Sequence, residues 1–515
     1  MNNKWWTLAA VCTGVFMLLL DITVVNVALP DIQRSLHSSF SDLQWVINAY
    51  ALTIAAFLLT AGVVGDMFGR RKLFAIGLAA FTAASLVCGL SGSSTMLDFA
   101  RAVQGIGGSI MLATSLALIA QAFSGKERGT AFGIYGSVLG GAVAIGPLVG
   151  GALTGGIGWR WIFFVNIPIG LVAIVLTLTR IQESRDPNQR RIDWVGFVSF
   201  SLALFLLVFA LVRGNDKGWG STEIVALLIG SGVLMAIFLT AEWRQSDPML
   251  DLALFKRPAM VGVSIATFSI AGSMFALFLY ITLYMQDVLG YGPLATGVRF
   301  LPLTLIAFAV APISGKLTTR FQSRFLLGTG LGLIGLSLIL MTSVDAASSW
   351  TALLPGFIVG GIGLGVANPV IASASVAVVP PARSGMASGS SNTFRQVGLS
   401  TGIAGLGAIF QSQVPTKAFS ALTTTSLGRH LLAHSSGQLH AGFIDGAVRA
   451  IALATHSAQE SHVLLHAYAV GFTASFRDLV TIAAVVAFVG AAAALVLIRQ
   501  RDFVPSFAAA AAPAG

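Results

Sequence analysis

The chain has 515 residues, of which 56% are hydrophobic and only 10% are charged, and its formal net charge is +10. Soluble domains carry roughly 25% charged residues, so this composition excludes a soluble globular protein and is typical of an integral membrane protein. The positive charge does not indicate nucleic-acid binding, because most Lys and Arg residues stand in short loops on one side of the predicted membrane.

The apolar runs predict about fourteen membrane-spanning helices, since a helix needs about 20 apolar residues to cross a bilayer. Runs of this length, in place of short alternating segments, exclude a membrane β-barrel. We therefore expect an all-α integral membrane protein. The runs lie near 6–28, 43–64, 73–91, 96–121, 130–154, 161–179, 194–212, 222–240, 259–284, 295–316, 325–343, 351–377, 388–411 and 472–497.

The distribution of basic residues predicts that both termini are cytoplasmic. A weak repeat of the segment after the second run indicates two six-helix halves, over 1–180 and 246–498, separated by a linker and two inserted helices over 181–245. Within the second half, residues 412–471 are expected to form an extracytoplasmic loop. The tail over 499–515, which is Ala-rich from Phe507 to Gly515, is expected to be cytoplasmic and disordered.

The first apolar run contains a carboxylate, Asp21. A charge inside a membrane span costs several kcal/mol unless it is paired or protonated, so Asp21 is a candidate functional residue. Arg101 lies at a similar depth in the fourth run and is the partner we expect, while Asp98, three residues before Arg101, is the alternative partner. Burial favours the neutral carboxyl and a guanidinium favours the ionised one, so the pair suits proton coupling. The alternative is a structural ion pair.

The connection between the second and third runs contains Asp66, Gly69, Arg70 and Arg71. Gly69 permits a tight turn, and the charges predict a gate at the cytoplasmic ends of the helices. Asp66 is expected to meet the N-terminus of another helix, where the helix dipole favours an anion. The alternative is a solvated loop that only obeys the positive-inside rule.

The fifth run is rich in small residues, among them Gly146, Gly150 and Gly151. Small residues four apart let membrane helices approach closely. Pro147 removes one helical hydrogen bond and predicts a bend. A bendable, closely packed helix between the two halves suits alternating access.

Polar and aromatic side chains in several runs are candidates for a substrate cavity. Aromatic rings favour flat lipophilic cations, and a charge at membrane depth is expected to face protein or a water-filled cavity. Ordinary packing is the alternative for each residue. The candidates are Asn26, Gln104, Phe275, Tyr280, Tyr284, Asn392 and Arg395.

Several segments, taken in order, resemble the fourteen-span drug:proton antiporters of the major facilitator superfamily. The stretch over 146–151 is similar to that family's antiporter motif. The resemblance implies two six-helix halves with two extra central helices, in a bacterial cytoplasmic (inner) membrane. It also implies that the helix which meets Asp66 begins near Gly385. The similar segments are 20–30, 62–72, 101–107, 146–151, 159–168 and 392–398.

We therefore expect a proton-coupled antiporter that exports small amphipathic or cationic compounds, and no enzyme. The expected partners are a small-molecule substrate, protons and the lipid bilayer, with no nucleic acid, and a monomer is the expected state. The proton gradient supplies the energy, at about 2.3 kcal/mol per charge per 100 mV, so no cofactor is needed. The alternatives are an exporter of one endogenous metabolite or lipid and, third, a membrane enzyme or sensor.

Six of the seven histidines lie within 412–471. His430 and His434, like His462 and His466, are four residues apart and could bind a metal on a helix. No carboxylate or thiolate cluster accompanies them, so we expect no metal site.

Overall fold

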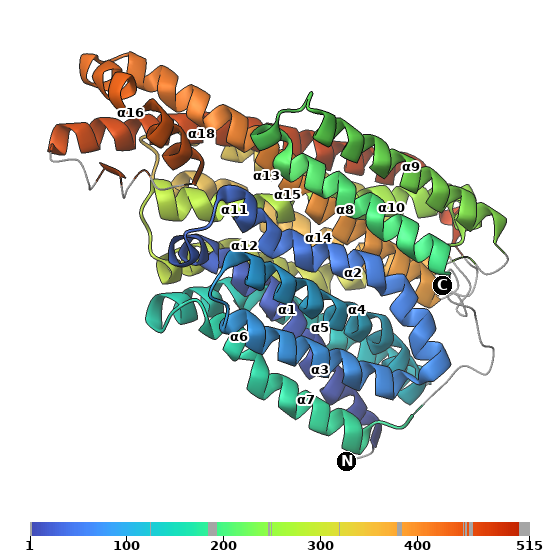
Figure 1. Ribbon diagram of the computed structural model, residues 1–515. Helices are drawn as coiled ribbons and strands as arrows, with labels where there is room; N and C mark the ends of the chain where they lie inside the picture. Colours follow the sequence, from blue (N-terminus) through green and yellow to red (C-terminus); the bar gives the residue numbers. More distant parts are fainter. Residues whose placement is uncertain are drawn as a thin grey trace.

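The protein is a bundle of long α-helices that run side by side (Figure 1), and no strand occurs in the part of the chain that the structure describes. The computed structural model describes residues 3–123, 125–183, 193–245, 248, 250–318, 320–378, 384–445, 448, 451–452 and 457–503.

The N-terminal half contains six spans, the last of which is divided at Val165. Hydroxyl groups fix where two of its helices begin. Ser39 and Asp42 form a reciprocal capping box at the start of α2, and the Ser93 hydroxyl accepts a hydrogen bond from the Met96 amide at the start of α4. The helices are α1 (Asn3–Leu36), α2 (Phe40–Phe68), α3 (Arg70–Gly89), α4 (Ser94–Ala122), α5 (Gly125–Gly156), α6 (Trp161–Phe164) and α7 (Asn166–Arg180).

Two inserted helices and the second half follow. The ninth span is one continuous rod that contains two π-helical turns, η2 and η3, and such turns are frequent at functional sites. The elements are α8 (Trp194–Lys217), α9 (Thr222–Arg244), η1 (Leu252–Lys256), α10 (Pro258–Ile270), η2 (Ala271–Phe275), α11 (Ala276–Leu283), η3 (Tyr284–Val288), α12 (Pro293–Leu317), α13 (Ser323–Met341), η4 (Trp350–Leu353), α14 (Leu354–Ala377), α15 (Ser384–Thr423), α16 (Ser426–Asp445), α18 (Ala458–Leu497) and η6 (Gln500–Asp502).

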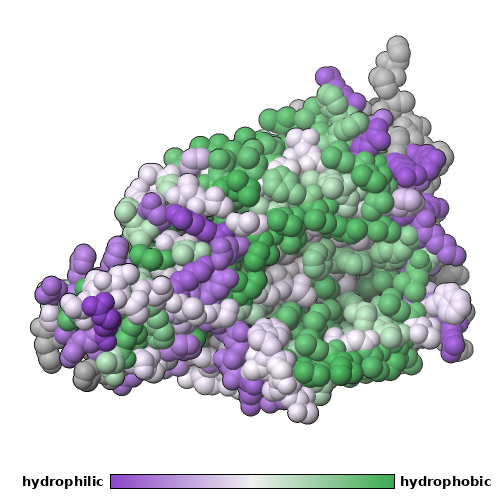
Figure 2. Space-filling view, turned by 90° about the horizontal axis from the view of Figure 1, so that it is seen from above, coloured by the Kyte–Doolittle hydropathy of each residue, from purple (hydrophilic) through white to green (hydrophobic). Residues whose placement is uncertain are grey.

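Among the described residues, 13 helices are long and apolar enough to cross a membrane. The predicted run that is missing from these thirteen, 388–411, lies in α15, which has 40 residues but carries polar side chains such as Asn392, Arg395 and Gln396. Each predicted run thus coincides with a helix. Hydrophobic residues form a band across the middle of the face shown in Figure 2, and hydrophilic residues gather towards its two ends. The chain is a multi-pass membrane protein.

Most of the described residues within 412–471, the predicted extracytoplasmic loop, are helical. α15 continues to Thr423, α16 follows, and α18 already begins at Ala458. Aromatic contacts hold these helices together: the Phe443 ring lies 5.6 Å from the Phe419 ring and 6.1 Å from the Tyr468 ring. In Figure 1 this part projects beyond the bundle. We call it the projecting end, and we call the opposite end, which holds both chain termini, the termini end.

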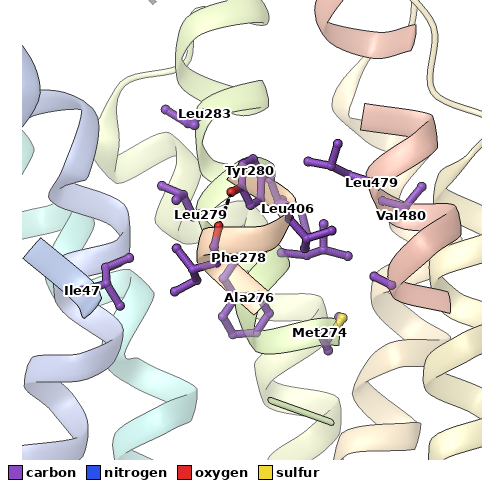
Figure 3. Packing of buried hydrophobic residues seen from close by; sticks show 14 of the residues in the cluster. Ile47, Met274, Ala276, Phe278, Leu279, Tyr280, Leu283, Leu406, Leu479 and Val480 are labelled. Atoms are coloured by element: carbon purple, nitrogen blue, oxygen red, sulfur yellow. Dashed lines mark hydrogen bonds between the residues drawn. The ribbon is translucent and has the colours of Figure 1, made fainter. Parts of the chain in front are cut away.

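The two halves meet in a core of buried side chains towards the projecting end. Tyr280 of α11 lies in this core, and its hydroxyl donates a hydrogen bond of 2.9 Å to the Ile403 carbonyl of α15 (Figure 3). Its ring lies 5.5 Å from that of Phe410, which stacks at 5.1 Å on Phe40 at the start of α2. Because these rings come from both halves, they close the projecting end.

Candidate functional site

Asp21 of α1 and Arg101 of α4 form a fully buried ion pair. The distance between Asp21 Oδ2 and Arg101 Nη1 is 2.5 Å, and the two side chains are 0% and 1% exposed. The predicted partner of Arg101 is therefore Asp21. No ion pair between Arg101 and Asp98 occurs among the described residues, and Ser93, not Asp98, caps α4.

Amide side chains complete the coordination of the Asp21 carboxylate. Its Oδ1 atom accepts hydrogen bonds from Gln104 Nε2 of α4 at 2.9 Å and from Asn166 Nδ2 of α7 at 3.0 Å. The Asn166 amide also donates to the Ser85 hydroxyl of α3 at 3.0 Å. Three helices, α1, α4 and α7, therefore meet at one carboxylate, and Asn166 connects the carboxylate to α3.

The Arg101 guanidinium also has hydrogen-bond and aromatic partners besides Asp21. Its Nε donates to the Val46 carbonyl at 3.1 Å, and Nη1 donates to Gln104 Oε1 at 2.7 Å. The guanidinium carbon lies 4.1 Å above the centre of the Tyr50 ring, within cation–π distance. α2 thus supplies a carbonyl and an aromatic face to the cation, so the pair connects α1, α2 and α4.

The predicted glycines of α5 lie directly beside this site. A Cβ atom on Gly146 would lie 1.8 Å from the Thr23 hydroxyl oxygen, and one on Gly150 would lie 2.8 Å from the Val24 carbonyl oxygen. Both neighbours follow Asp21 on α1. On another face of α5, a Cβ on Gly151 would lie 2.5 Å from the Pro293 carbonyl of α12, in the other half. α5 therefore links the ion pair to the interface between the halves.

A glycine of α12 also allows the close contact between α5 and α12. A Cβ on Gly297 of α12 would lie 2.2 Å from the Pro147 carbonyl oxygen of α5. Pro147 lies inside α5, which runs unbroken from Gly125 to Gly156. The close approach of α5 and α12, together with a hydrogen bond of 2.8 Å from Gln286 of η3 to the Val27 carbonyl, adds to the closure of the projecting end.

The turn between α2 and α3 is organised by Glu183, which the sequence did not single out. Gly69 adopts a φ of +112°, a conformation that favours glycine. The Glu183 carboxylate accepts hydrogen bonds from the backbone amides of Arg71 at 3.0 Å and Lys72 at 3.2 Å. Arg71 Nε also lies 3.8 Å from Glu183 Oε2. The acidic partner of this helix N-terminus thus comes from the segment after α7.

The structure describes only part of the rest of the predicted gate. Arg70 begins α3. The side chains of Asp66 and of residues 384–386, which include the predicted contact near Gly385, lie outside what the structure describes. The role of Asp66 therefore stays a prediction.

We expect Glu183→Gln to destabilise the fold by about 1 kcal/mol, because it removes the charge that caps α3. The midpoint of thermal unfolding of the purified protein measures this effect. Asp478→Asn is the control, since Asp478 forms a half-exposed ion pair with Lys417 in the middle of α18, far from a helix N-terminus. Equal midpoints for the two variants would show that the cap contributes nothing.

The predicted cavity residues do not form one group. Gln104 belongs to the ion-pair site. Asn26 is half-buried and donates to the Ile22 carbonyl of its own helix at 3.2 Å. Tyr280 and Tyr284 are 0% exposed, and the Tyr284 ring stacks at 5.8 Å on Phe476. In this structure Tyr280 packs in the core between the two halves, and Tyr284 packs against α18 in the second half.

Arg395 marks a second polar position at membrane depth. Its guanidinium donates to the Asn368 side chain of α14, and its guanidinium carbon lies 5.4 Å from the centre of the Phe275 ring of η2. Asn392 lies on the same helix, α15, and is half-buried. Phe275 and Arg395 are thus brought together as neighbours, in the second half.

The inserted helix α8 is hydrogen-bonded to both halves near the projecting end. The Asn215 amide of α8 donates to the Ala408 carbonyl of α15 and, at 3.4 Å, to Gln411. Gln411 donates to the Ser41 hydroxyl of α2 at 3.3 Å, and Ser41 donates to Asp216 of α8 at 3.2 Å. We call this chain of contacts the α8 network. α9, in contrast, lies at the edge of the bundle (Figure 1).

The sequence reasoning missed several of these residues. Asn166, Ser85 and Tyr50 are polar or amphipathic groups in apolar runs, but they carry no charge, so their burial is a weaker signal than that of Asp21. Glu183 and Asn215 carried no such signal, because each lies near the end of a predicted span, where polar residues are common.

A membrane bundle of two helical halves that meet through small residues, with a buried ion pair between its helices, has the architecture of a membrane transporter. The family model of the Major Facilitator Superfamily matches residues 11–403. The chain belongs to the Major Facilitator Superfamily.

Individual proteins agree with this assignment. The chain is 37% identical over 405 residues to the multidrug resistance protein Stp of Mycobacterium tuberculosis, covering 78% of this chain and 75% of that protein. It is 36% identical over 420 residues to the tetracenomycin C resistance and export protein of Streptomyces glaucescens, covering 80% and 77%. A bacterial homologue of the human lysosomal transporter Spinster has the same fold, with a TM-score of 0.60 at 19% identity and 98% coverage of both chains.

Proposed function

We propose that this transporter exports small amphipathic or cationic compounds in exchange for protons, in a bacterial cytoplasmic membrane. The observation that carries the proposal is the buried pair of Asp21 and Arg101. The names of the relatives, which are resistance and export proteins, support the direction of transport and the class of substrate. The proton gradient would supply the energy, with no cofactor.

The geometry suits a carboxylate that alternates between two states. Ionised Asp21 balances Arg101 and accepts hydrogen bonds from Gln104 and Asn166. Protonation would remove the negative charge from a site where the arginine charge cannot be solvated, and this penalty favours rearrangement of the helices around it. A cationic substrate could compensate the same carboxylate. Competition between proton and substrate for one charge is the basis of exchange.

We further propose that the termini end faces the cytoplasm, as the distribution of basic residues predicts. The halves are in contact at the projecting end, so this arrangement would be closed to the outside. In the alternate state α5 would separate from α12, and α2 from α15. Asp66, Gly69, Arg70 and Arg71 would then act at the cytoplasmic ends as the gate that limits the exchange between the two states. We take the transporting unit to be the monomer.

Transport into everted membrane vesicles tests the function. With an acidic interior, we expect vesicles that contain the protein to accumulate several lipophilic cationic dyes, and a protonophore to abolish the accumulation. The compounds should also compete with one another, because one site serves all of them. Vesicles from cells without the protein are the control.

The second candidate function is export of one endogenous metabolite or lipid by the same cycle. It predicts that a single compound, and none of the dyes, is accumulated and competes. Accumulation that does not respond to the pH gradient would contradict proton exchange for either class of substrate.

A further inference from the structure

Three arginines converge on one pocket at the termini end of the second half. Arg324 lies in the first turn of α13, and Arg499 and Arg501 follow the end of α18. Together with Gln322 they line a pocket of about 420 Å³. α13 and α18 are adjacent here, since a Cβ on Gly328 would lie 2.6 Å from the Leu495 side chain. The pocket therefore belongs to two packed helices.

The positive charge of this pocket is not balanced within the described part of the chain. None of the three arginines forms an ion pair there, and Arg324 Nε is buried without a hydrogen-bond partner. The neighbouring carboxylate, Asp502, instead accepts a hydrogen bond of 3.3 Å from the Ala259 amide at the start of α10. Gln322 provides no side-chain cap to α13, whose N-terminal dipole adds further positive potential. The pocket is thus suited to an anion.

The surroundings of the pocket are apolar and exposed. Phe325 of α13 and Val496 of α18 are 50% and 64% exposed, and Phe321 is 55% exposed. In a membrane protein such side chains face lipid chains, whereas a soluble anion would gain nothing from them. A charged pocket bordered by apolar side chains at the end of a membrane bundle matches the two parts of a phospholipid.

We propose that this pocket binds the phosphate headgroup of an anionic phospholipid, with the acyl chains lying against Phe325 and Val496. Arg324, Arg499 and Arg501 would contact the phosphate oxygens, for which the guanidinium group is well suited. The inference does not rest on the proposed transport function. It concerns a site at the periphery of α13 and α18, remote in sequence from the ion pair.

Lipid binding to the purified full-length protein, measured by native mass spectrometry, tests the proposal. We expect phosphatidylglycerol to bind more tightly than phosphatidylcholine. Replacing the three arginines with Gln should weaken phosphatidylglycerol binding on the order of a hundredfold, about fivefold for each charge. The matched control replaces three exposed arginines elsewhere, Arg180, Arg213 and Arg244, with Gln, and it should bind phosphatidylglycerol as the unmodified protein does.

Three outcomes would overturn the proposal: equal binding of the two lipids, equal loss in both triple variants, or displacement of phosphatidylglycerol by millimolar inorganic phosphate, which would assign the site to a soluble anion. Should the triple variant fail to fold, the double variant Arg499→Gln with Arg501→Gln replaces it, because both residues lie beyond the end of α18. The comparison of the two lipids requires no variant.

Discussion

Replacing Asp21 with Asn is expected to abolish proton-driven transport. The amide cannot exchange a proton, and it leaves the buried Arg101 charge without its counterion. Removal of one partner of a buried ion pair costs about 3–5 kcal/mol. We therefore expect dye accumulation in everted vesicles to fall to background and the unfolding midpoint of the purified variant to fall as well. Binding of substrate to the purified variant, measured by dye fluorescence, should no longer depend on pH.

Asp98→Asn is the matched control for this experiment. Asp98 lies three residues before Arg101 on the same helix and has the same side chain, but Arg101 is paired with Asp21. We expect the Asp98 variant to keep proton-driven accumulation. If Asp98→Asn abolished transport and Asp21→Asn did not, the roles assigned to the two carboxylates would be wrong.

The second large effect is expected at the contact between α5 and α12. In Gly151→Ala, the new methyl group would lie 2.5 Å from a backbone carbonyl of Pro293, which cannot rotate away. Overpacking of this kind costs about 1–3 kcal/mol, and here it would act on the arrangement in which the projecting end is closed. We expect transport to fall at least about tenfold, because about 1.4 kcal/mol changes an equilibrium by that factor.

Gly156→Ala on the same helix is the control, since no atom lies within 4 Å of a Cβ built there. It should leave both transport and the unfolding midpoint unchanged. To separate misfolding from a shifted conformational equilibrium, the reaction of a cysteine introduced at Val27 with a water-soluble thiol reagent can be measured. It should increase in Gly151→Ala if the projecting end opens. Unchanged transport in Gly151→Ala would contradict the role of this contact.

The positions of the helices and the pair of Asp21 and Arg101 were predictable, because each depends on one strong physical effect. Apolar length identified the spans, and the cost of a buried charge identified Asp21 and Arg101. The partners that complete the site, Asn166 and Tyr50, were not predictable, because their role depends on which helices become neighbours. A single polar residue in one span does not indicate which other helices will lie beside it.

The segment over 412–471 was expected to be an extracytoplasmic loop, and its described part is mostly helical. A helix in a connection between spans needs only an apolar stripe to pack, and Phe443 and Tyr468 contribute to it. The side of the membrane on which this segment lies stays a prediction. Tyr280 and Tyr284 are buried in this structure, and their expected place in a substrate cavity stays a prediction. An aromatic side chain in a span serves packing or binding equally well, so the sequence cannot separate the two.

The α8 network has a consequence for how such a bundle can open. Ser41 and Gln411 belong to opposite halves, and Asn215 and Asp216 of α8 bond one half each. Parting α2 from α15 at this end must break the bond between Ser41 and Gln411, and must also detach α8 from one of its two neighbours. In the proposed cycle the inserted pair would therefore move together with one half only, and which half it follows would determine the lipid-facing surface that is displaced.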